Sequence, residues 1–173
     1  MKKQIVIING TGGSGKDTFV EFCTKYGKIM NFSSVDKVKE IAKYIGWNGG
    51  KSEKDRKFLS DLKRLTTNYN DLSFESIKDA VYQFENSNKE ILFIHIREPE
   101  EIERAANAFS AKTLLIKRVG LENITTNYSD ANVDNYPYDY IIENTTLEEL
   151  DHNALNFINQ LKYTKVKELK KHI

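Results

Sequence analysis

A glycine-rich segment near the N-terminus constrains this chain more than any other feature. It runs Gly10-Thr11-Gly12-Gly13-Ser14-Gly15-Lys16-Asp17-Thr18. Residues 4–9 before it are apolar and rich in β-branched side chains, which predicts a buried strand. The apolar residues after it recur at helical spacing: Phe19, Phe22, Cys23 and Tyr26. Strand, glycine loop and helix in this order predict a phosphate-binding loop. The alternative is a glycine turn beside a solvated lysine, which would need neither the strand before it nor the helix after it.

The chemistry of this loop predicts an ATP site. The residues expected at the nucleotide are Gly10, Gly12, Gly13, Ser14, Gly15, Lys16, Asp17 and Thr18. Lys16 is expected to reach the β- and γ-phosphates, and the helix N-terminus adds partial positive charge. Asp17 stands where many such loops have a Ser or Thr ligand of Mg²⁺. Either Asp17 and Thr18 organise Mg²⁺, or Asp17 is a first-turn aspartate favoured by the helix dipole.

Composition excludes several classes of protein. With 173 residues the chain fits one domain, 1–173, and a net charge of +1 gives no case for binding nucleic acid or a membrane surface. The single cysteine, Cys23, falls on the apolar helix face and is expected in the core. No signal-peptide pattern and no membrane-spanning apolar run are present, so we expect a cytoplasmic protein, monomeric or homodimeric.

Apolar runs and helical stripes alternate along the rest of the chain. Strands are predicted at 28–32, 90–96, 112–117 and 138–143, and helical stripes separate most of them. Thr145 with Glu148 is expected to cap a final helix whose apolar face includes Leu147 and Leu150. Alternating strands and helices predict an α/β fold of three layers, with a five-stranded parallel sheet of order 2-3-1-4-5 and helices on both faces.

Charged and polar residues follow several of the predicted strands. Ligands bind outside the carboxyl ends of parallel strands, so these positions are candidates for a site. Arg97 follows the third strand, Arg118 the fourth, and Asn144-Thr145 the fifth. Only five residues are arginine in a lysine-rich chain, and arginine suits planar, bidentate binding of phosphate.

The loop Gly-Ser-Gly-Lys-Asp-Thr resembles that of deoxynucleoside monophosphate kinases and the phosphomevalonate kinase group. Residues 95–101, His-Ile-Arg-Glu-Pro-Glu-Glu, resemble a segment of the former family that reads Asp-x-Arg before a proline. The resemblance implies that Arg97 binds the acceptor phosphate. His95 stands in place of the family aspartate, either as a structural histidine or as a donor to phosphate.

The same resemblance places an acceptor-binding helical insert at 35–85 and a lid at 119–137. Lys39 and Arg56 are implied as ligands of the acceptor phosphate, and Arg64 either joins them or forms a surface ion pair. Trp47 either stacks on an acceptor base or closes a helix turn. Arg118 is implied as the lid cation, and a lid would exclude water from phosphoryl transfer.

The turn Asn144-Thr145 resembles the adenine-side turn of P-loop kinases. The sequence thus predicts a P-loop kinase that moves the γ-phosphoryl group of Mg·ATP to a nucleoside or deoxynucleoside monophosphate. The catalytic residues would be Lys16, Asp17, Arg97 and Arg118. Two alternatives stay open: another acceptor, such as phosphomevalonate or dephospho-coenzyme A, and a non-catalytic ATP-binding protein.

Overall fold

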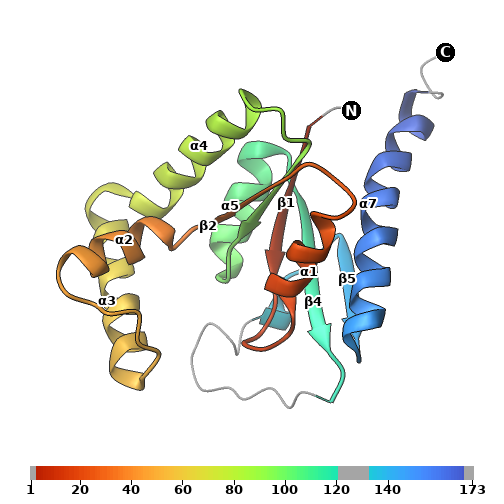
Figure 1. Cartoon of the computed structure of the whole chain (residues 1–173). Coiled ribbons are helices and arrows are strands. Elements are labelled where there is room, and N and C mark those ends of the chain that lie inside the picture. Colours follow the sequence, from red (N-terminus) through yellow and green to blue (C-terminus); the bar gives the residue numbers. More distant parts are fainter. Residues whose placement is uncertain (1–2, 121–132, 170–173) are drawn as a thin grey trace. The chain divides into compact units, whose positions relative to one another are not determined.

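A five-stranded parallel sheet is the frame of the protein. The computed structural model describes residues 3–120 and 133–169, and side chains as far as residue 162. Its strands are β1 (Gln4–Asn9), β2 (Ile29–Ser33), β3 (Ile91–His95), β4 (Lys112–Arg118) and β5 (Tyr140–Asn144). Their order is β2-β3-β1-β4-β5, which confirms the predicted topology (Figure 1).

The centre of the sheet is buried on both faces. In the parallel register β1 lies between β3 and β4, with Val6 opposite Phe93 and Lys112. Because side chains alternate along a strand, Val6 and Ile8 face one way and Ile7 faces the other, and all three are fully buried. This explains the continuous apolar runs from which the strands were predicted.

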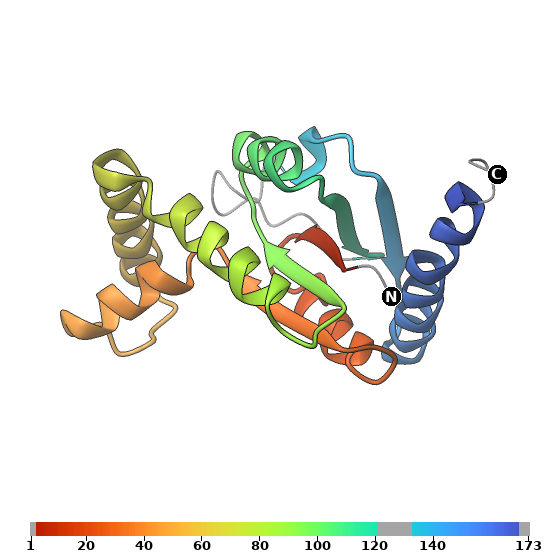
Figure 2. The same ribbon diagram turned by 90° about the horizontal axis from the view of Figure 1, so that it is seen from above.

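Helices cover the two faces of this sheet (Figure 2). On one face, α1 (Lys16–Cys23) and α7 (Leu147–Leu169) pack together around an aromatic cluster. The rings of Phe19, Phe93 and Phe157 meet there with centroids 5.8–6.4 Å apart. On the other face lies α5 (Pro99–Phe109), which begins at its proline and contacts β1 and β4.

Cys23 is fully buried in this core, as expected for a structural cysteine. Burial raises the pKa of its thiol to about 12, with a smaller contribution from the Asp151 carboxylate. A thiol held in this state is a poor nucleophile, because the reactive form is the thiolate.

The residues between β2 and β3 form a compact unit of their own, Phe32–Ser87. It contains α2 (Asp36–Tyr44), α3 (Glu53–Asn70) and α4 (Leu72–Glu85), which contact one another in all three pairs. Ser52 and Asp55 cap α3 reciprocally, since each side chain accepts from the backbone N–H of the other residue. The remaining described residues, within 1–31 and 88–169, form the unit that carries most of the sheet.

The final helix begins one residue later than predicted. The hydroxyl of Thr146 accepts from the backbone N–H of Glu149, so Thr146 and not Thr145 caps α7. Thr145 instead donates its backbone N–H and its hydroxyl to the Glu149 carboxylate. Leu147, predicted on the apolar face, is 68% exposed, whereas Leu150 is 1% exposed. In the described part of the chain, none of the helices has the length and apolar character to cross a membrane.

Candidate functional site

The glycine loop connects the end of β1 to the start of α1, as the sequence predicts. A side chain at Gly10 would place its Cβ 2.5 Å from Ser14 Oγ and 2.7 Å from the carbonyl oxygen of Ile116, so only glycine fits. Gly15 has φ 92°, a left-handed conformation that glycine adopts without strain, and it precedes the first residue of α1. The Ser14 hydroxyl is buried and has no hydrogen-bond partner among the described residues.

The loop is fixed to the sheet by the buried side chain of Asn144. Its amide nitrogen donates to the carbonyl oxygens of Ser14 (3.3 Å) and Lys117 (2.9 Å). The backbone carbonyl of Asn144 accepts from Val119. The side-chain amide therefore ties the glycine loop to the ends of β4 and β5, because these two strands pair Arg118 with Asn144.

A cavity of about 390 Å³ opens over the loop. Most of the residues expected at ATP line it, namely the run Gly13–Thr18 with Asn144 and Thr145, whereas Gly10 and Gly12 do not. Arg118, the expected lid cation, lines it as well. Thr146, Leu147 and Leu150 line it as well, although Leu147 and Leu150 were predicted only on the apolar face of the final helix. The exposure of Leu147 follows from this position at the cavity. The adjacent turn at Thr145, which was predicted to lie at the adenine, is the sequence signal that could have placed Leu147 and Leu150 at the site.

Two cations and one carboxylate set the electrostatics of this cavity. Lys16 is half-buried at the first turn of α1, and Arg118 is exposed at the end of β4. Asp17 is exposed, with 84% of its side-chain surface accessible. The N-terminus of α1 adds partial positive charge at the same place. The lining thus favours an anion, and a phosphate chain is the anion that a loop of this form holds best.

His95 connects the end of β3 to the start of α1. Its Nε2 lies 2.8 Å from Oδ1 of Asn31, and its Nδ1 lies 3.6 Å from a carboxylate oxygen of Asp17. Only 12% of the imidazole surface is accessible. His95, which departs from the pattern of the resembled family, is therefore held between Asn31 of β2 and Asp17, the carboxylate predicted to bind metal.

Arg97 lies two residues beyond the end of β3 and is half-buried. Its backbone carbonyl accepts from the side-chain amide of Asn9 at 3.1 Å. It is not among the residues that line the 390 Å³ cavity, so its role toward an acceptor stays a prediction. Of the predicted lid, residues 121–132 lie outside the described part of the chain.

The other predicted acceptor ligands belong to the unit Phe32–Ser87. Lys39 lies on α2, 3.9 Å from Asp36, and the Nε of Arg56 donates to the carbonyl of Lys51. Trp47 is half-buried and its backbone N–H donates to Ala42, so it closes the C-terminal turn of α2. Arg64 forms a surface ion pair with Asp61 at 3.4 Å. Their contact with an acceptor remains a prediction.

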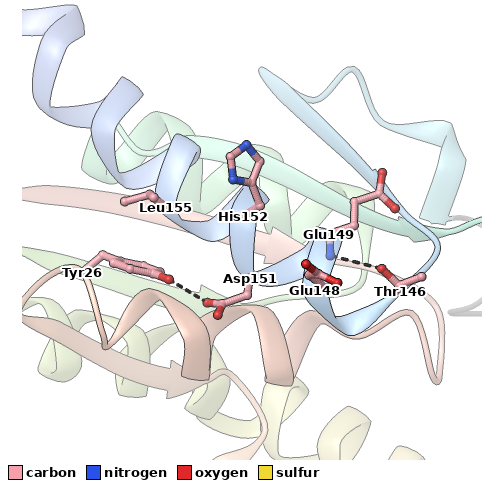
Figure 3. A pocket seen from close by; sticks show the side chains of 7 residues that line it. All are labelled: Tyr26, Thr146, Glu148, Glu149, Asp151, His152 and Leu155. Carbon is pink, nitrogen blue, oxygen red and sulfur yellow. Dashed lines mark hydrogen bonds between the residues drawn. The ribbon is translucent and has the colours of Figure 1, made fainter.

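A second hollow, of about 540 Å³, lies beside α7 (Figure 3). Its lining residues are Tyr26, Thr146, Glu148, Glu149, Asp151, His152 and Leu155. Tyr26 donates its hydroxyl to Asp151, and Lys25 donates to the same carboxylate from 2.8 Å. Three carboxylates among seven lining residues disfavour phosphate, so the smaller cavity over the glycine loop is the candidate active site.

Solved structures share this fold. TT1252 from Thermus thermophilus is 17% identical, with 91% of this chain and 97% of that chain covered and a TM-score of 0.57. Shikimate kinase from Aquifex aeolicus is 12% identical, with 92% and 99% covered and a TM-score of 0.52. No family model and no curated protein matches the sequence. The likeness, the strand order and the glycine loop together show that the chain has the fold of P-loop kinases.

Proposed function

We propose that the protein is an ATP-dependent phosphotransferase whose acceptor is a nucleoside or deoxynucleoside monophosphate. One observation carries the phosphotransferase part: the cavity over the glycine loop combines Lys16, Asp17 and Arg118 with the turn at Asn144. These residues come from the ends of β1, β4 and β5, which meet at one edge of the sheet. Phosphoryl transfer needs mainly positioning and charge stabilisation, and this cavity offers both.

Each part of the cavity has a proposed role toward ATP. Lys16 and the backbone N–H groups of the loop hold the β- and γ-phosphates, and the Ser14 hydroxyl is a donor that the loop leaves for a ligand. Arg118 neutralises charge that develops on the transferring group, a role worth roughly 10³–10⁵ in rate for arginine. The turn Asn144-Thr145 lies at the nucleoside end, with Leu147 and Leu150 as its apolar surface.

Mg²⁺ fits the donors present when phosphate oxygens complete its shell. The described residues contain no cluster of three or more His, Cys, Asp or Glu side chains suited to a metal. Mg²⁺ commonly takes one or two protein ligands together with waters and phosphates. The Thr18 hydroxyl and the Asp17 carboxylate would supply these ligands. The ion, when bound, would neutralise charge on the phosphates.

The proposal for the acceptor rests on the resemblance of residues 95–101 to the deoxynucleoside monophosphate kinases. Arg97 would hold the phosphate of the monophosphate, with Lys39 or Arg56 as a further cation and Trp47 against the base. Arg97 starts from a fixed backbone position, because its carbonyl is bonded to Asn9. A planar guanidinium suits a bidentate phosphate contact.

A coupled ADP-release assay across a panel of nucleoside and deoxynucleoside monophosphates tests the proposal. We expect one or a few monophosphates to stimulate turnover, and Lys16→Ala to remove it. Lys78→Ala is the matched control, since Lys78 is an exposed lysine on α4 paired with Glu75. If no monophosphate stimulates turnover of the folded protein, the monophosphate proposal fails.

A non-catalytic ATP-binding protein is the second candidate, and His95 favours it. A histidine stands where the resembled family has a carboxylate, which reduces the number of anionic metal ligands at this edge. This candidate predicts ATP binding that Lys16→Ala abolishes, with no turnover for any acceptor. Calorimetric titration of ATP beside the turnover assay distinguishes the two functions.

A further inference from the structure

A buried hydrogen-bond relay joins three segments at the edge of the sheet that carries the glycine loop. Its centre is Asn9, the last residue of β1, which is 1% exposed. Its amide nitrogen donates to the carbonyl of Arg97 (3.1 Å) and to the hydroxyl of Tyr138 (2.8 Å). The Tyr138 hydroxyl donates in turn to the carbonyl of Val133 at 3.0 Å.

The direction of every bond in this relay is determined. The backbone N–H of Gly10 donates to Oδ1 of Asn9 at 2.8 Å, and a backbone N–H can only donate. The NH₂ group of Asn9 must therefore face Arg97 and Tyr138. Burial raises the pKa of Tyr138 to about 12, with a smaller opposing effect from the Asn9 bond. Its hydroxyl thus stays protonated at neutral pH and donates to Val133 while it accepts from Asn9.

This relay replaces the backbone ladder where the ladder ends. The β1–β3 register pairs Ile8 with His95, and Ile96 still donates its N–H to the carbonyl of Ile8. Beyond this point the backbone of β1 turns into the glycine loop. The side chain of Asn9 continues the connection to Arg97 in its place. The chain beyond Arg97 is fixed as well, because α5 begins at Pro99.

The far end of the relay is anchored as firmly. Val133 is 2% exposed in the short helix η1 (Val133–Asn135). Lys117 at the end of β4 pairs with the adjacent Asp134 at 2.7 Å. The ring of Tyr138 packs edge-on against Tyr136, with centroids 5.1 Å apart. Tyr138 therefore holds Asn9 from a segment that is itself bound to the sheet.

We propose that Asn9 and Tyr138 are positioning residues that set the backbone of Arg97 relative to the glycine loop. The expected consequence is selective, because Gly10 is held by Oδ1 of Asn9 and Arg97 by its amide nitrogen. Losing the Tyr138 hydroxyl disturbs the amide that holds Arg97 but leaves the Gly10 bond in place. This role rests on the proposed function for its kinetic consequence, though not for its structural one.

Tyr138→Phe tests the role, and Tyr136→Phe is its control. Both substitutions remove one hydroxyl from neighbouring tyrosines and keep the ring, but only Tyr138 belongs to the relay. With the monophosphate that supports turnover, we expect Tyr138→Phe to raise its KM by about tenfold or more, as for a small displacement of a binding group. The KM for ATP should stay within about twofold of the wild-type value. A substitution that weakened binding of both substrates equally would raise the KM for ATP and the KM for the monophosphate alike.

A structural readout makes the result independent of catalysis. In ¹H–¹⁵N spectra of the full chain, Tyr138→Phe should shift the Asn9 side-chain NH₂ signals and the backbone signals of residues 96–98, and Tyr136→Phe should shift them far less. Equal shifts for the two variants, or an equal rise in both KM values, would overturn the positioning role. Shifted signals in a protein without turnover would refute the proposed function and leave the relay standing.

Discussion

Asn144→Asp is expected to release the glycine loop from the sheet. The amide nitrogen of Asn144 donates to the carbonyls of Ser14 and Lys117, and its residue is 4% exposed. An aspartate of the same shape puts an oxygen against both carbonyls, so the buried bond to Ser14 and the part-buried bond to Lys117 are lost. Each carbonyl left without a partner costs about 1–3 kcal/mol, so the loss of both bonds should lower the free energy of unfolding by about 3 kcal/mol.

Thermal unfolding measures this loss, and Asn153→Asp is the matched control. For a chain of this length, about 3 kcal/mol corresponds to a fall in Tm of about 6–12 °C. Asn153 makes one bond from an exposed amide to the carbonyl of Glu143 at 3.3 Å, so its substitution should stay within about 0.5 kcal/mol. Similar Tm values for the two variants would show that Asn144 does not hold the loop, and would refute this reasoning.

Three further predictions concern Gly10, Cys23 and Asp151. Gly10→Ala should weaken ATP binding by about tenfold, because the new Cβ would overlap Ser14 and the Ile116 carbonyl. Gly12→Ala should leave ATP binding unchanged, since no atom lies within 4 Å of the Cβ it would add. Calorimetric titration of ATP compares the two variants. Cys23 should react with a thiol reagent at pH 8 only after denaturation, because it is buried and its pKa is raised to about 12; reaction of the native protein would contradict this. Hydrogen bonds from Lys25 and Tyr26 lower the pKa of Asp151, so its stabilisation is present above the ordinary carboxyl pKa of 3.8 and is lost as pH falls below it. Chemical denaturation at pH 6 and pH 3 should therefore show a smaller acid loss for Asp151→Asn than for the wild type.

The sequence predicted most of the sheet because its central strands, β1, β3 and β4, are buried on both faces. Strands such as β3 are apolar and buried up to their last residue, so their position follows from composition alone. The cap of α7 was wrong by one residue because Thr145 and Thr146 are adjacent and both have glutamate three residues later. The local sequence is compatible with a helix that begins after either threonine. The structure places Leu150 in the core and Leu147 at the cavity.

The polar contacts that fix the site could not be predicted from the sequence. Asn144 and Ser14 are 130 residues apart, and Asn9 and Tyr138 are 129 residues apart. In the sequence, Asn9 and Asn144 cannot be distinguished from asparagines that cap a turn. Their hydrogen-bond partners lie next to them only in the folded chain. The glycine loop was predictable because its function depends on neighbouring residues. Arg118 was predictable because it follows a strand, and the β1–β4 pairing brings the end of that strand to the same cavity.

Transfer of label from γ-labelled ATP tests the central claim most directly. The wild-type protein is incubated with Mg²⁺, labelled ATP and the monophosphate panel, and the products are separated. We predict label in the nucleoside diphosphate formed from one or a few of the monophosphates, and none with Lys16→Ala. Label found only in inorganic phosphate, or retained entirely in ATP, would contradict the claim that this cavity transfers a phosphoryl group to a monophosphate.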